Sequence, residues 1–500
     1  MIRNGLIKYF KTRRAQIGIV SIAMIGITFL LGSSLSSNVF FPRAPQLDDS
    51  VFRYVGMVMQ NGGVPYKDTF DHKGPLIYLI NYLGMLLCKN GIWFFELAGL
   101  FLTVLFTYKT IRLFVKPTAS MVGTCLVLFQ LYDYLGGGNY TEEYALPYIV
   151  CAIYIFTNYF LKGKTSRLKL TICGACFMAV MLLRANMISV WLVFAIAVLI
   201  TEIHSHSVKW LEYFLFFALG ASVFLLPFLV YFLLNGALSD FWEDYIIFNL
   251  SYTGTIVVDK GEAIRFFLWS APCAIALIIG GIRIITQKEN IKIDVINLIY
   301  ATVCIYMTGM GGRTYNHYGI ILIPLTIIPT ARILHYVCEK QMKRRLVVGA
   351  IIAIIVMCYP WLHQLSNKEL NTTAPEQSLE GIIASFIREN TNEDNLIIQC
   401  GHKDIFYVLS ERMAASKYSY PLPIAQIKND VYDDFFDDLE VNKPTVIITD
   451  SWDEQKQLDY TEINRRLEIY LEKHGYVEGP KIETYSLYYA PGSVLANTWK

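Results

Sequence analysis

A succession of long apolar runs most constrains what this chain can fold into. A helix that crosses a lipid bilayer needs about 20 mostly apolar residues. Eleven runs approach or exceed that length, near residues 16–37, 92–114, 118–135, 143–161, 168–184, 186–203, 209–234, 263–285, 292–310, 318–338 and 344–363. Only 17% of the 500 residues are charged, whereas soluble proteins average about 25%. The runs therefore predict a mainly α-helical, polytopic membrane protein.

The distribution of Lys and Arg predicts which loops share a side of the membrane, because short cytoplasmic loops are enriched in these residues. A further apolar run, 74–88, is shorter than a typical span. If it is a surface or re-entrant helix, the basic clusters gather on one side: Lys8–Arg14, Lys109–Lys116, Lys162–Lys169, Lys209, Arg283–Lys292 and Lys340–Arg345. We therefore expect eleven spans, an uncleaved first span and an extracytoplasmic C-terminus. The alternative is that 74–88 spans and is balanced elsewhere, within roughly 11 to 13 transmembrane helices.

Residues 364–500 differ from the rest of the chain in charge and in pattern. Leu396–Ile398 and Thr445–Thr449 have the apolar, β-branched character of buried strands. Residues 376–390 and 460–474 have the periodicity of amphipathic helices. This segment is therefore predicted to be a small α/β domain outside the membrane.

These patterns predict two domains. The first, 1–363, is a transmembrane domain with a large first outer loop at 38–91, and the second, 364–500, is the extracytoplasmic α/β domain. Most cysteines lie in or beside apolar runs, including Cys173 and Cys176 in a C-x-x-C, and we interpret them as packing residues. Because the inner loops are short and merely basic, an active site is expected on the outer face.

The first outer loop combines acidic, basic and glycine-containing sequence. Asp48 and Asp49 follow the first span, and Gly62–Leu76 reads GGVPYKDTFDHKGPL. One interpretation is that either aspartate caps a surface helix at 50–60. The other is that a carboxylate is held at the membrane surface beside Lys73, a cation suited to a phosphate.

The second outer loop, Gly136–Tyr144, reads GGGNYTEEY. Three glycines allow a sharp turn or a close approach of the backbone to another group. Glu142 and Glu143 either complement a helix N-terminus or form a second acidic site. Glu96 lies inside a span, where charge is usually functional, and is interpreted either as a partner of an outer basic residue or as part of the site.

Two further outer segments carry cationic and aromatic candidates. Arg184 either extends to lipid headgroups or binds a phosphate. The loop Gly311–Tyr318 contains Arg313, Tyr315 and His317, which suit a phosphate and a sugar ring. Tyrosines are common at membrane interfaces, so the aromatic residues by themselves are weak evidence.

Taken in order, these motifs resemble the GT-C superfamily of membrane glycosyltransferases, specifically the group related to dolichyl-phosphate-mannose protein mannosyltransferases and aminoarabinose lipid A transferases. The resemblance is carried by the acidic pair, G-x-PY-x-D-x-FDHKGP, G-G-N-x-T-E-E-Y, L-L-R-x-N and R-x-Y-x-H-Y. It is most specific at 47–80, 136–148 and 311–324. Many of these enzymes carry Lys-Pro-Pro where this chain has Lys73-Gly74-Pro75, which indicates a subgroup.

The resemblance implies a role for each matching residue. Asp48 matches the catalytic base, with Asp49 as its alternative, and Glu142 and Glu143 match the second acidic site. Lys73 matches the lysine near the carrier phosphate. The other residues expected to bind the lipid phosphate or the sugar are His72, Tyr66, Arg184, Arg313, Tyr315 and His317. No metal ligand or certain cofactor is predicted, and a divalent cation is left open because related enzymes differ in needing one.

The resemblance also implies the reaction. A hexose or pentose is expected to pass from a polyprenyl-phosphate donor to a glycan, lipid or protein acceptor of the cell envelope, at the outer face of the cell membrane, by an inverting single displacement. The acids of the two outer loops are expected to converge beside cations. The main alternative is a lipid-linked sugar flippase or transporter, and a polymerase or ligase of whole glycans is a third. No nucleic-acid partner is indicated.

Overall fold

The structure is a computed structural model that describes residues 13–255, 259–286, 291–339, 374–450 and 458–498. Internal contacts divide the chain into two compact units. Unit 1 comprises Met1–Asn38, Trp93–Leu229 and Val257–Asn371, and unit 2 comprises Val39–Ile92, Val230–Ile256 and Thr372–Lys500. This division groups the first outer loop with the C-terminal segment, whereas the domain boundary predicted from sequence lies at 363/364.

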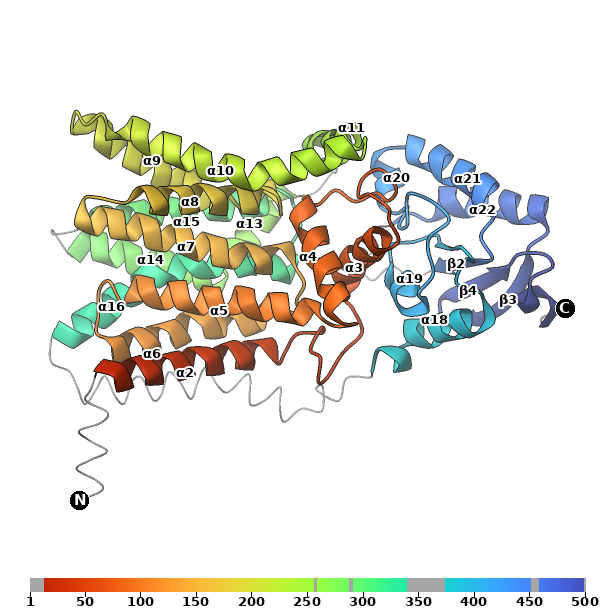
Figure 1. Cartoon of the computed structure of the whole chain (residues 1–500), viewed down its shortest axis with the longest axis horizontal. Coiled ribbons are helices and arrows are strands. Elements are labelled where there is room, and N and C mark those ends of the chain that lie inside the picture. The colour runs from red at the N-terminus through yellow and green to blue at the C-terminus, as the bar shows by residue number, and fades with distance from the viewer. Residues whose placement is uncertain (1–12, 256–258, 287–290, 340–373, 451–457, 499–500) are drawn as a thin grey trace, which may run out of the picture. The chain divides into compact units, whose positions relative to one another are not determined.

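Unit 1 is a bundle of apolar helices, several of which run roughly parallel to one another (Figure 1). Its elements in chain order are α2 (Arg13–Gly32), α5 (Ile92–Ile111), α6 (Pro117–Leu128), η1 (Phe129–Asp133), α7 (Thr141–Lys162), α8 (Arg167–Met181), η2 (Ala185–Met187), α9 (Ser189–His204), most of α10 (Lys209–Leu234), α13 (Lys260–Leu268), α14 (Ala271–Thr286), α15 (Lys292–Gly309), η4 (Asn316–Thr326) and α16 (Ile327–Glu339). Local signals set the ends of these helices. Pro117 begins α6, and Gly163 ends α7 in the left-handed conformation that glycine tolerates best.

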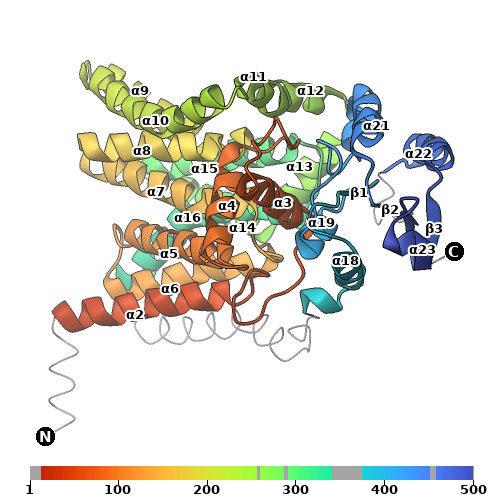
Figure 2. The same cartoon turned by 45° about the vertical axis from the view of Figure 1, so that its right-hand side comes forward.

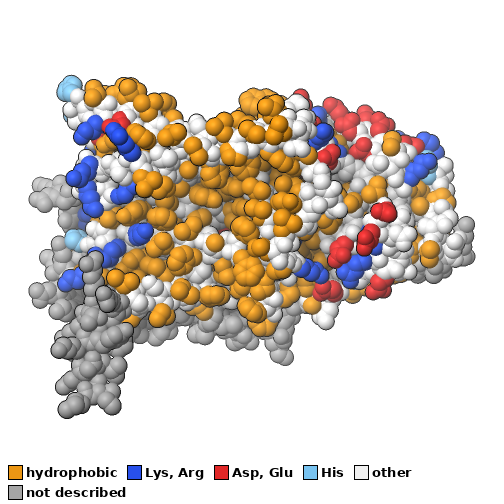
Figure 3. All heavy atoms as spheres, in the orientation of Figure 1, with side chains coloured by type: hydrophobic (Ala, Val, Ile, Leu, Met, Phe, Trp, Pro, Cys, Tyr) orange, Lys and Arg blue, Asp and Glu red, His pale blue; other side chains and the backbone are white. Residues whose placement is uncertain are grey.

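Four of the described helical segments are long and apolar enough to cross a membrane: Ile92–Ile111, Thr141–Lys162, Lys209–Leu234 and Asn316–Cys338. Burial distinguishes them. In the most apolar stretch of α7, 78% of the residues are buried, whereas in that of α10 only 11% are. α7 is therefore an inner helix of the bundle, and α10 exposes an apolar surface that suits lipid. Figure 3 shows hydrophobic side chains spread over the face of unit 1 that is seen in this view.

The predicted span at 263–285 is not one straight helix. It forms α13 and α14, which are bent by 67° at a short break. Pro272, the second residue of α14, has no amide hydrogen and disfavours a helical conformation in the residue before it. Pro272 is therefore a sequence signal for the break between α13 and α14. Together the two helices are apolar enough to form a broken span or a re-entrant segment.

Other predicted spans are helical where the structure describes them, but several are shorter than predicted. Examples are α8, with 15 residues, and α9, with 16. The run 344–363 lies outside the described residues. The run 74–88 forms α4 (Pro75–Leu87) in unit 2, a helix of 13 residues. A helix of that length extends about 20 Å, less than the hydrocarbon thickness of about 30 Å.

Basic residues gather at one end of the unit 1 helices, at the left of Figure 3. These residues end or begin successive helices: Lys109 in α5, Lys162 in α7, Arg167 in α8, Lys209 in α10, Arg283 in α14 and Lys292 in α15. Such a gathering is typical of the cytoplasmic ends of membrane helices. Which side of the membrane this end faces stays a prediction.

Unit 2 combines short helices with one sheet. Its elements are α3 (Leu47–Gln60), α4, α11 (Leu238–Phe241), the π-helical η3 (Trp242–Ile247), α12 (Phe248–Thr255), η6 (Pro375–Gln377), α18 (Leu379–Asn390), β1 (Ile397–Gln399), α19 (Ile405–Ser410), α20 (Ile424–Ile427), α21 (Asp430–Asn442), β2 (Val446–Asp450), α22 (Thr461–His474), β3 (Val477–Ile482), β4 (Tyr485–Tyr489) and α23 (Val494–Thr498).

The sheet has the strand order β1-β2-β4-β3. β1 runs parallel to β2, with Ile397 opposite Val446, whereas β4 pairs with both β2 and β3 in antiparallel fashion. Both predicted strands and both predicted amphipathic helices (α18 and α22) are confirmed. β3, β4 and α21 were not predicted.

The segment 38–91, predicted to be the first outer loop, contributes to the hydrophobic core of unit 2. The ring of Tyr54 in α3 lies 4.8 Å from that of Tyr407 in α19, and the Tyr54 hydroxyl accepts a hydrogen bond from the amide of Ala414. Met57 and Val58 are buried in the same core as the sheet. The side-by-side packing of α3 and α19 can be followed in Figure 2. The C-terminal segment thereby fixes the helix that carries the acidic pair.

Candidate functional site

The two aspartates at the start of α3 are held differently. Neither caps the helix, because α3 begins at Leu47 and both lie in its first turn. Asp49 is fully buried, and its carboxylate pairs with the guanidinium of Arg53 through contacts of 2.6 and 3.3 Å. Asp48 is half-buried. Asp49 is therefore held within the helix, whereas Asp48 is the more exposed of the two carboxylates and is the better candidate for chemistry on a bound molecule.

Asp71 anchors the loop between α3 and α4. Its buried carboxylate accepts hydrogen bonds from the hydroxyl of Tyr420 at 2.6 Å, from the hydroxyl of Tyr78 at 2.7 Å and from the amide of His72 at 2.7 Å. Burial raises the pKa of Asp71, while the charge of Lys73 and the two tyrosine hydrogen bonds oppose that rise. The loop is thus fixed around one buried acid.

Lys73 is positioned by the two residues that precede it. Its Nζ lies 2.9 Å from Nε2 of His72, and Nδ1 of the same ring lies 3.4 Å from Oδ1 of Asp71. A lysine ammonium can only donate hydrogen bonds, so Nε2 is the acceptor and the imidazole proton is assigned to Nδ1, which faces Asp71. The run Asp71-His72-Lys73 therefore holds a half-buried cation in a defined position.

Tyr66 holds the same loop from inside. It is fully buried, with φ of 70°, and its hydroxyl donates to the carbonyl of Lys73 at 2.6 Å. Its ring packs on Tyr78, Phe232 and Phe241 at centroid distances of 5.7, 5.5 and 5.6 Å. This burial argues against the predicted contact of Tyr66 with a substrate and favours a supporting role beneath Lys73.

In unit 1, the glycine-rich loop before α7 turns through left-handed conformations. Gly136, Gly138 and Asn139 have φ values of 58°, 84° and 54°. Glu96 accepts a hydrogen bond from the amide of Asn139 at 2.7 Å and another from the hydroxyl of Ser37. A Cβ on Gly138 would come within 2.5 Å of Glu96 Oε1. Both of these partners belong to loops, and neither is the outer basic residue that one of the two sequence interpretations expected.

Glu142 and Arg184 form an ion pair at the start of α7. The guanidinium carbon of Arg184 also lies 4.2 Å from the centroid of the Tyr318 ring, a cation–π arrangement. Glu143, the next residue in sequence after Glu142, is also buried. A Cβ added at Gly138 would lie 3.2 Å from Oε2 of Glu143. Glu142 and Glu143 therefore both lie in a buried, polar part of unit 1.

His317 belongs to a stack of aromatic rings next to Arg184. Its ring is stacked on Tyr140 at 4.3 Å and on Tyr315 at 5.7 Å, within 3° and 10° of parallel. The Tyr318 ring, which carries the Arg184 contact, meets His317 edge-on at 4.8 Å. Segments that are far apart in sequence thus form one cationic and aromatic cluster. Arg313 lies half-buried in the same loop.

The predicted residues are therefore divided between the two units. We refer to Asp48, Asp49, Tyr66, His72 and Lys73 as the unit 2 cluster, and to Glu142, Glu143, Arg184, Arg313, Tyr315 and His317 as the unit 1 cluster. That the acids of the two loops converge beside cations stays a prediction. Carboxylates can take a proton, and Lys or Arg can stabilise a phosphate. In the part of the chain that the structure describes, no group of three or more His, Cys, Asp or Glu residues could hold a metal ion.

Residues 11–357 match a family model described as "Putative competence-induced protein Ccs4 N-terminal domain". The match covers more than half of the chain. The chain belongs to this Ccs4 N-terminal family. The region that defines the Ccs4 family includes the sequence motifs of both clusters and ends before the described part of the C-terminal α/β segment begins. A search of curated proteins finds no match to the chain.

Solved structures identify the fold of this Ccs4-family protein. ArnT from Cupriavidus metallidurans bound to undecaprenyl phosphate aligns with a TM-score of 0.62 at 11% identity, over 94% of this chain and 97% of that one. The apo state of the same ArnT gives 0.61 at 11% identity, over 95% and 98%. The oligosaccharyltransferase AglB from Archaeoglobus fulgidus, in complex with an inhibitory peptide and a dolichol-phosphate, gives 0.51 at 12% identity, over 88% and 70%. The GT-C fold is confirmed.

Asp71 and Tyr420 are residues of the candidate site that the sequence did not reveal. Asp71 lies within the DHKGP motif, but the sequence predicted only its neighbours His72 and Lys73 as phosphate ligands. Tyr420 lies in a loop of the C-terminal segment without a recognisable motif. Burial raises the pKa of its hydroxyl, and the charges of Asp71, Asp404 and Asp48 add to that effect. Asp48 is therefore in electrostatic reach of the residue that binds Asp71.

Proposed function

We propose that this protein is a membrane glycosyltransferase that takes a sugar from a polyprenyl-phosphate donor. The observation that supports this most strongly is the combination of a GT-C fold with a half-buried Asp48 and a positioned Lys73 in one unit. Asp48 would act as the base and Lys73 would bind the donor phosphate. Asp49 is the weaker candidate for the base, because Arg53 already occupies its carboxylate.

In the proposed reaction, a hydroxyl of the acceptor attacks C1 of the sugar. The hydroxyl proton passes to the Asp48 carboxylate, a new C1–O bond forms, and the bond between C1 and the phosphate oxygen breaks. Its electron pair leaves with the polyprenyl phosphate. General-base catalysis of this kind contributes about 10²–10⁴-fold. Because the leaving group is an anion, it needs cations rather than an acid. One displacement inverts the configuration at C1.

The unit 1 cluster is proposed to bind a phosphate or a sugar. Arg184 offers a planar, multidentate cation that Glu142 and Tyr318 hold in place. Tyr315 and His317 offer ring faces and polar edges of the kind that sugars contact. Glu143 is the second acid of this cluster. The reaction is proposed to occur at the outer face of the cell membrane, with the C-terminal segment on the same side of the membrane.

The proposed acceptors are a glycan, a lipid or a protein of the cell envelope, and the donor sugar is a hexose or a pentose. The test is transfer in vitro by the purified full-length protein from synthetic polyprenyl-phosphate sugars. Candidate donors are those whose sugar is missing from the envelope of cells that lack the protein. Inverted product and released polyprenyl phosphate are expected. Movement of an intact donor across a vesicle membrane, without cleavage of its sugar–phosphate bond, would instead indicate the transporter.

A further inference from the structure

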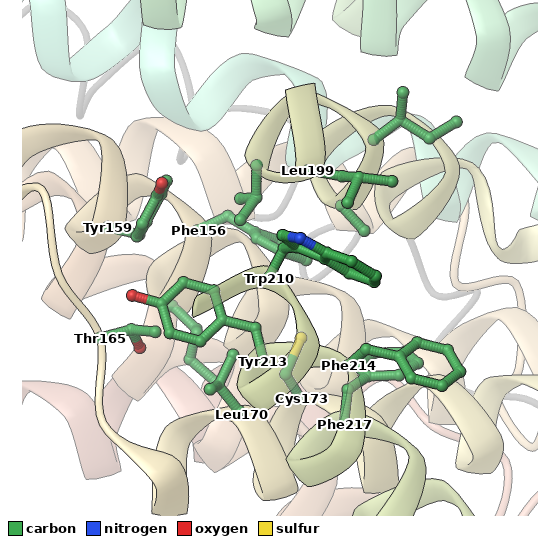
Figure 4. Close-up of a pocket in the computed structure, with 14 residues that line it drawn as sticks. Phe156, Tyr159, Thr165, Leu170, Cys173, Leu199, Trp210, Tyr213, Phe214 and Phe217 are labelled. Carbon is green, nitrogen blue, oxygen red and sulfur yellow. The ribbon is translucent and has the colours of Figure 1, made fainter. Parts of the chain in front are cut away.

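A partly open pocket of about 250 Å³ lies among α7, α8, α9 and α10 of unit 1 (Figure 4). Its lining is almost wholly apolar and aromatic. In Figure 4 the rings of Trp210, Phe214 and Phe217 from α10 lie near Leu199 of α9 and Cys173 of α8. None of the residues proposed for sugar transfer lines this pocket.

One end of the pocket lies beside a basic loop. Thr165, which lines the pocket, is part of the loop Lys162–Arg167 between α7 and α8, and Trp210 directly follows Lys209. The side chains of Lys162, Lys164 and Lys209 are exposed, and within the described residues they form no ion pair. Two acids lie at this end of the pocket: Glu212 pairs with Arg167 at 2.7 Å, and the buried Glu202 accepts a hydrogen bond from the hydroxyl of Tyr159, which lines the pocket. Together with Lys162, Lys164 and Lys209, this leaves an excess of positive charge at this end.

The start of α8 adds to this excess of positive charge. A helix N-terminus carries a partial positive charge that favours anions, yet α8 begins with Arg167 and has no acidic residue in its first turn. Trp210 and Tyr213 line the pocket near the same end, and such residues prefer the level of lipid headgroups. An apolar pocket that ends in cations and interfacial aromatic residues matches an amphiphile with an anionic head.

We propose that this pocket binds one acyl chain of an anionic glycerophospholipid. The chain would lie between Phe214, Phe217 and Leu199, and the phosphate would lie against the loop Lys162–Arg167 and Lys209. Basic clusters at the ends of membrane helices bind anionic headgroups in this way. The pocket is lined by different residues from the transfer site, so the proposal does not depend on the proposed function.

The test uses the purified full-length protein in detergent, exchanged into equal amounts of phosphatidylglycerol, phosphatidylcholine and undecaprenyl phosphate, with bound lipid measured by native mass spectrometry. One phosphatidylglycerol is expected to be retained in preference to phosphatidylcholine. Ala195→Trp fills the pocket and should abolish this retention, whereas Leu219→Trp, on the exposed face of α10, should leave it unchanged.

The headgroup is tested separately with Lys162→Gln, Lys164→Gln and Lys209→Gln. These exposed substitutions do not depend on how the core tolerates tryptophan. Each should lower the preference for phosphatidylglycerol by about five-fold, the effect of about 1 kcal/mol per basic residue, and Lys116→Gln, on the exposed loop before α6, should not. The proposal is overturned by equal retention of the two phospholipids, by unchanged retention in Ala195→Trp, or by displacement of phosphatidylglycerol from this pocket by undecaprenyl phosphate.

Discussion

The hydroxyl of Tyr420 donates a hydrogen bond of 2.6 Å to the buried carboxylate of Asp71, across 349 residues of sequence. This bond joins the C-terminal segment to the loop that carries Lys73. A second bond from the amide of Phe70 to the carbonyl of Lys417, at 2.9 Å, lies beside it. The C-terminal segment is therefore part of the framework of the candidate site, and it is more than an appended domain.

Tyr420→Phe should destabilise unit 2, because it removes a hydrogen bond to a buried carboxylate and keeps the ring. Hydrogen bonds to charged groups contribute about 1.5–3 kcal/mol, and a loss of that size is expected in thermal or denaturant unfolding of the full-length protein. The control is Tyr418→Phe. The hydroxyl of Tyr418 makes a longer hydrogen bond, 3.4 Å to Asp434, so its loss should cost less stability. Equal stability of the two variants would remove Asp71 as the anchor of the loop.

The ion pair of Asp49 and Arg53 should be structural. Asp49→Ala leaves a guanidinium that is 5% exposed without its carboxylate, which typically costs about 3–5 kcal/mol. Replacing both residues by apolar ones of similar volume, as in Asp49→Leu with Arg53→Met, should restore much of that stability. Melting curves measure this. If Asp49→Asn melts like the wild type but loses transfer, the role of base passes from Asp48 to Asp49.

Asp404 should give unit 2 a pH-dependent stability. Burial raises its pKa to about 7, the hydrogen bond from Ser419 opposes the rise, and the charge of Asp71 adds to it. In the unfolded chain an aspartate has a pKa of about 3.9. Between about pH 4 and 7 the folded state binds more protons than the unfolded state, so the unfolding free energy falls as pH rises and levels off above 7.

The measurement is the difference in melting temperature between the wild type and Asp404→Asn at several pH values. Asparagine cannot titrate, so the wild type should lose stability relative to the variant as pH rises toward 7. Converted to the free energy of unfolding, the difference between the two proteins should change by up to about 1.4 kcal/mol per pH unit. Parallel pH profiles for the two proteins would show that Asp404 titrates normally.

Arg184→Lys should impair transfer although the charge is kept. Lysine cannot reproduce both the contact with Glu142 and the stacked position over Tyr318. We expect kcat/KM for the donor to fall on the order of 10-fold or more, equivalent to about 1.4 kcal/mol or more. Arg167→Lys, exposed and paired with Glu212, is the matched control. Wild-type kinetics for Arg184→Lys would exclude the guanidinium from donor binding.

Local sequence signals predicted much of this fold. The apolar, β-branched segments Leu396–Ile398 and Thr445–Thr449 predicted strands, and β1 (Ile397–Gln399) and β2 (Val446–Asp450) form there. The periodicity of 460–474 likewise predicted α22. Pro272 was overlooked as a break because the apolar run continues across it. The signals that failed were those of short or polar segments, such as β3, in which polar residues interrupt the alternation.

Long-range pairing explains what the sequence could not reveal about the candidate site. The DHKGP motif predicted roles for His72 and Lys73. The role of Asp71 depends on its hydrogen bond with Tyr420, and no local sequence pattern links Asp71 to Tyr420. Likewise, the two aspartates at the start of α3 look equivalent in sequence. They differ because Arg53 lies one helical turn after Asp49 and binds that carboxylate.

The most direct test is the rate of sugar transfer from a polyprenyl-phosphate donor by Asp48→Asn. The amide keeps the shape of the side chain but cannot accept the acceptor proton, so transfer should fall by about 10²-fold or more, with an unchanged melting temperature. Asp430→Asn, an exposed acid at the start of α21, should retain wild-type transfer. Wild-type transfer by Asp48→Asn would contradict the account.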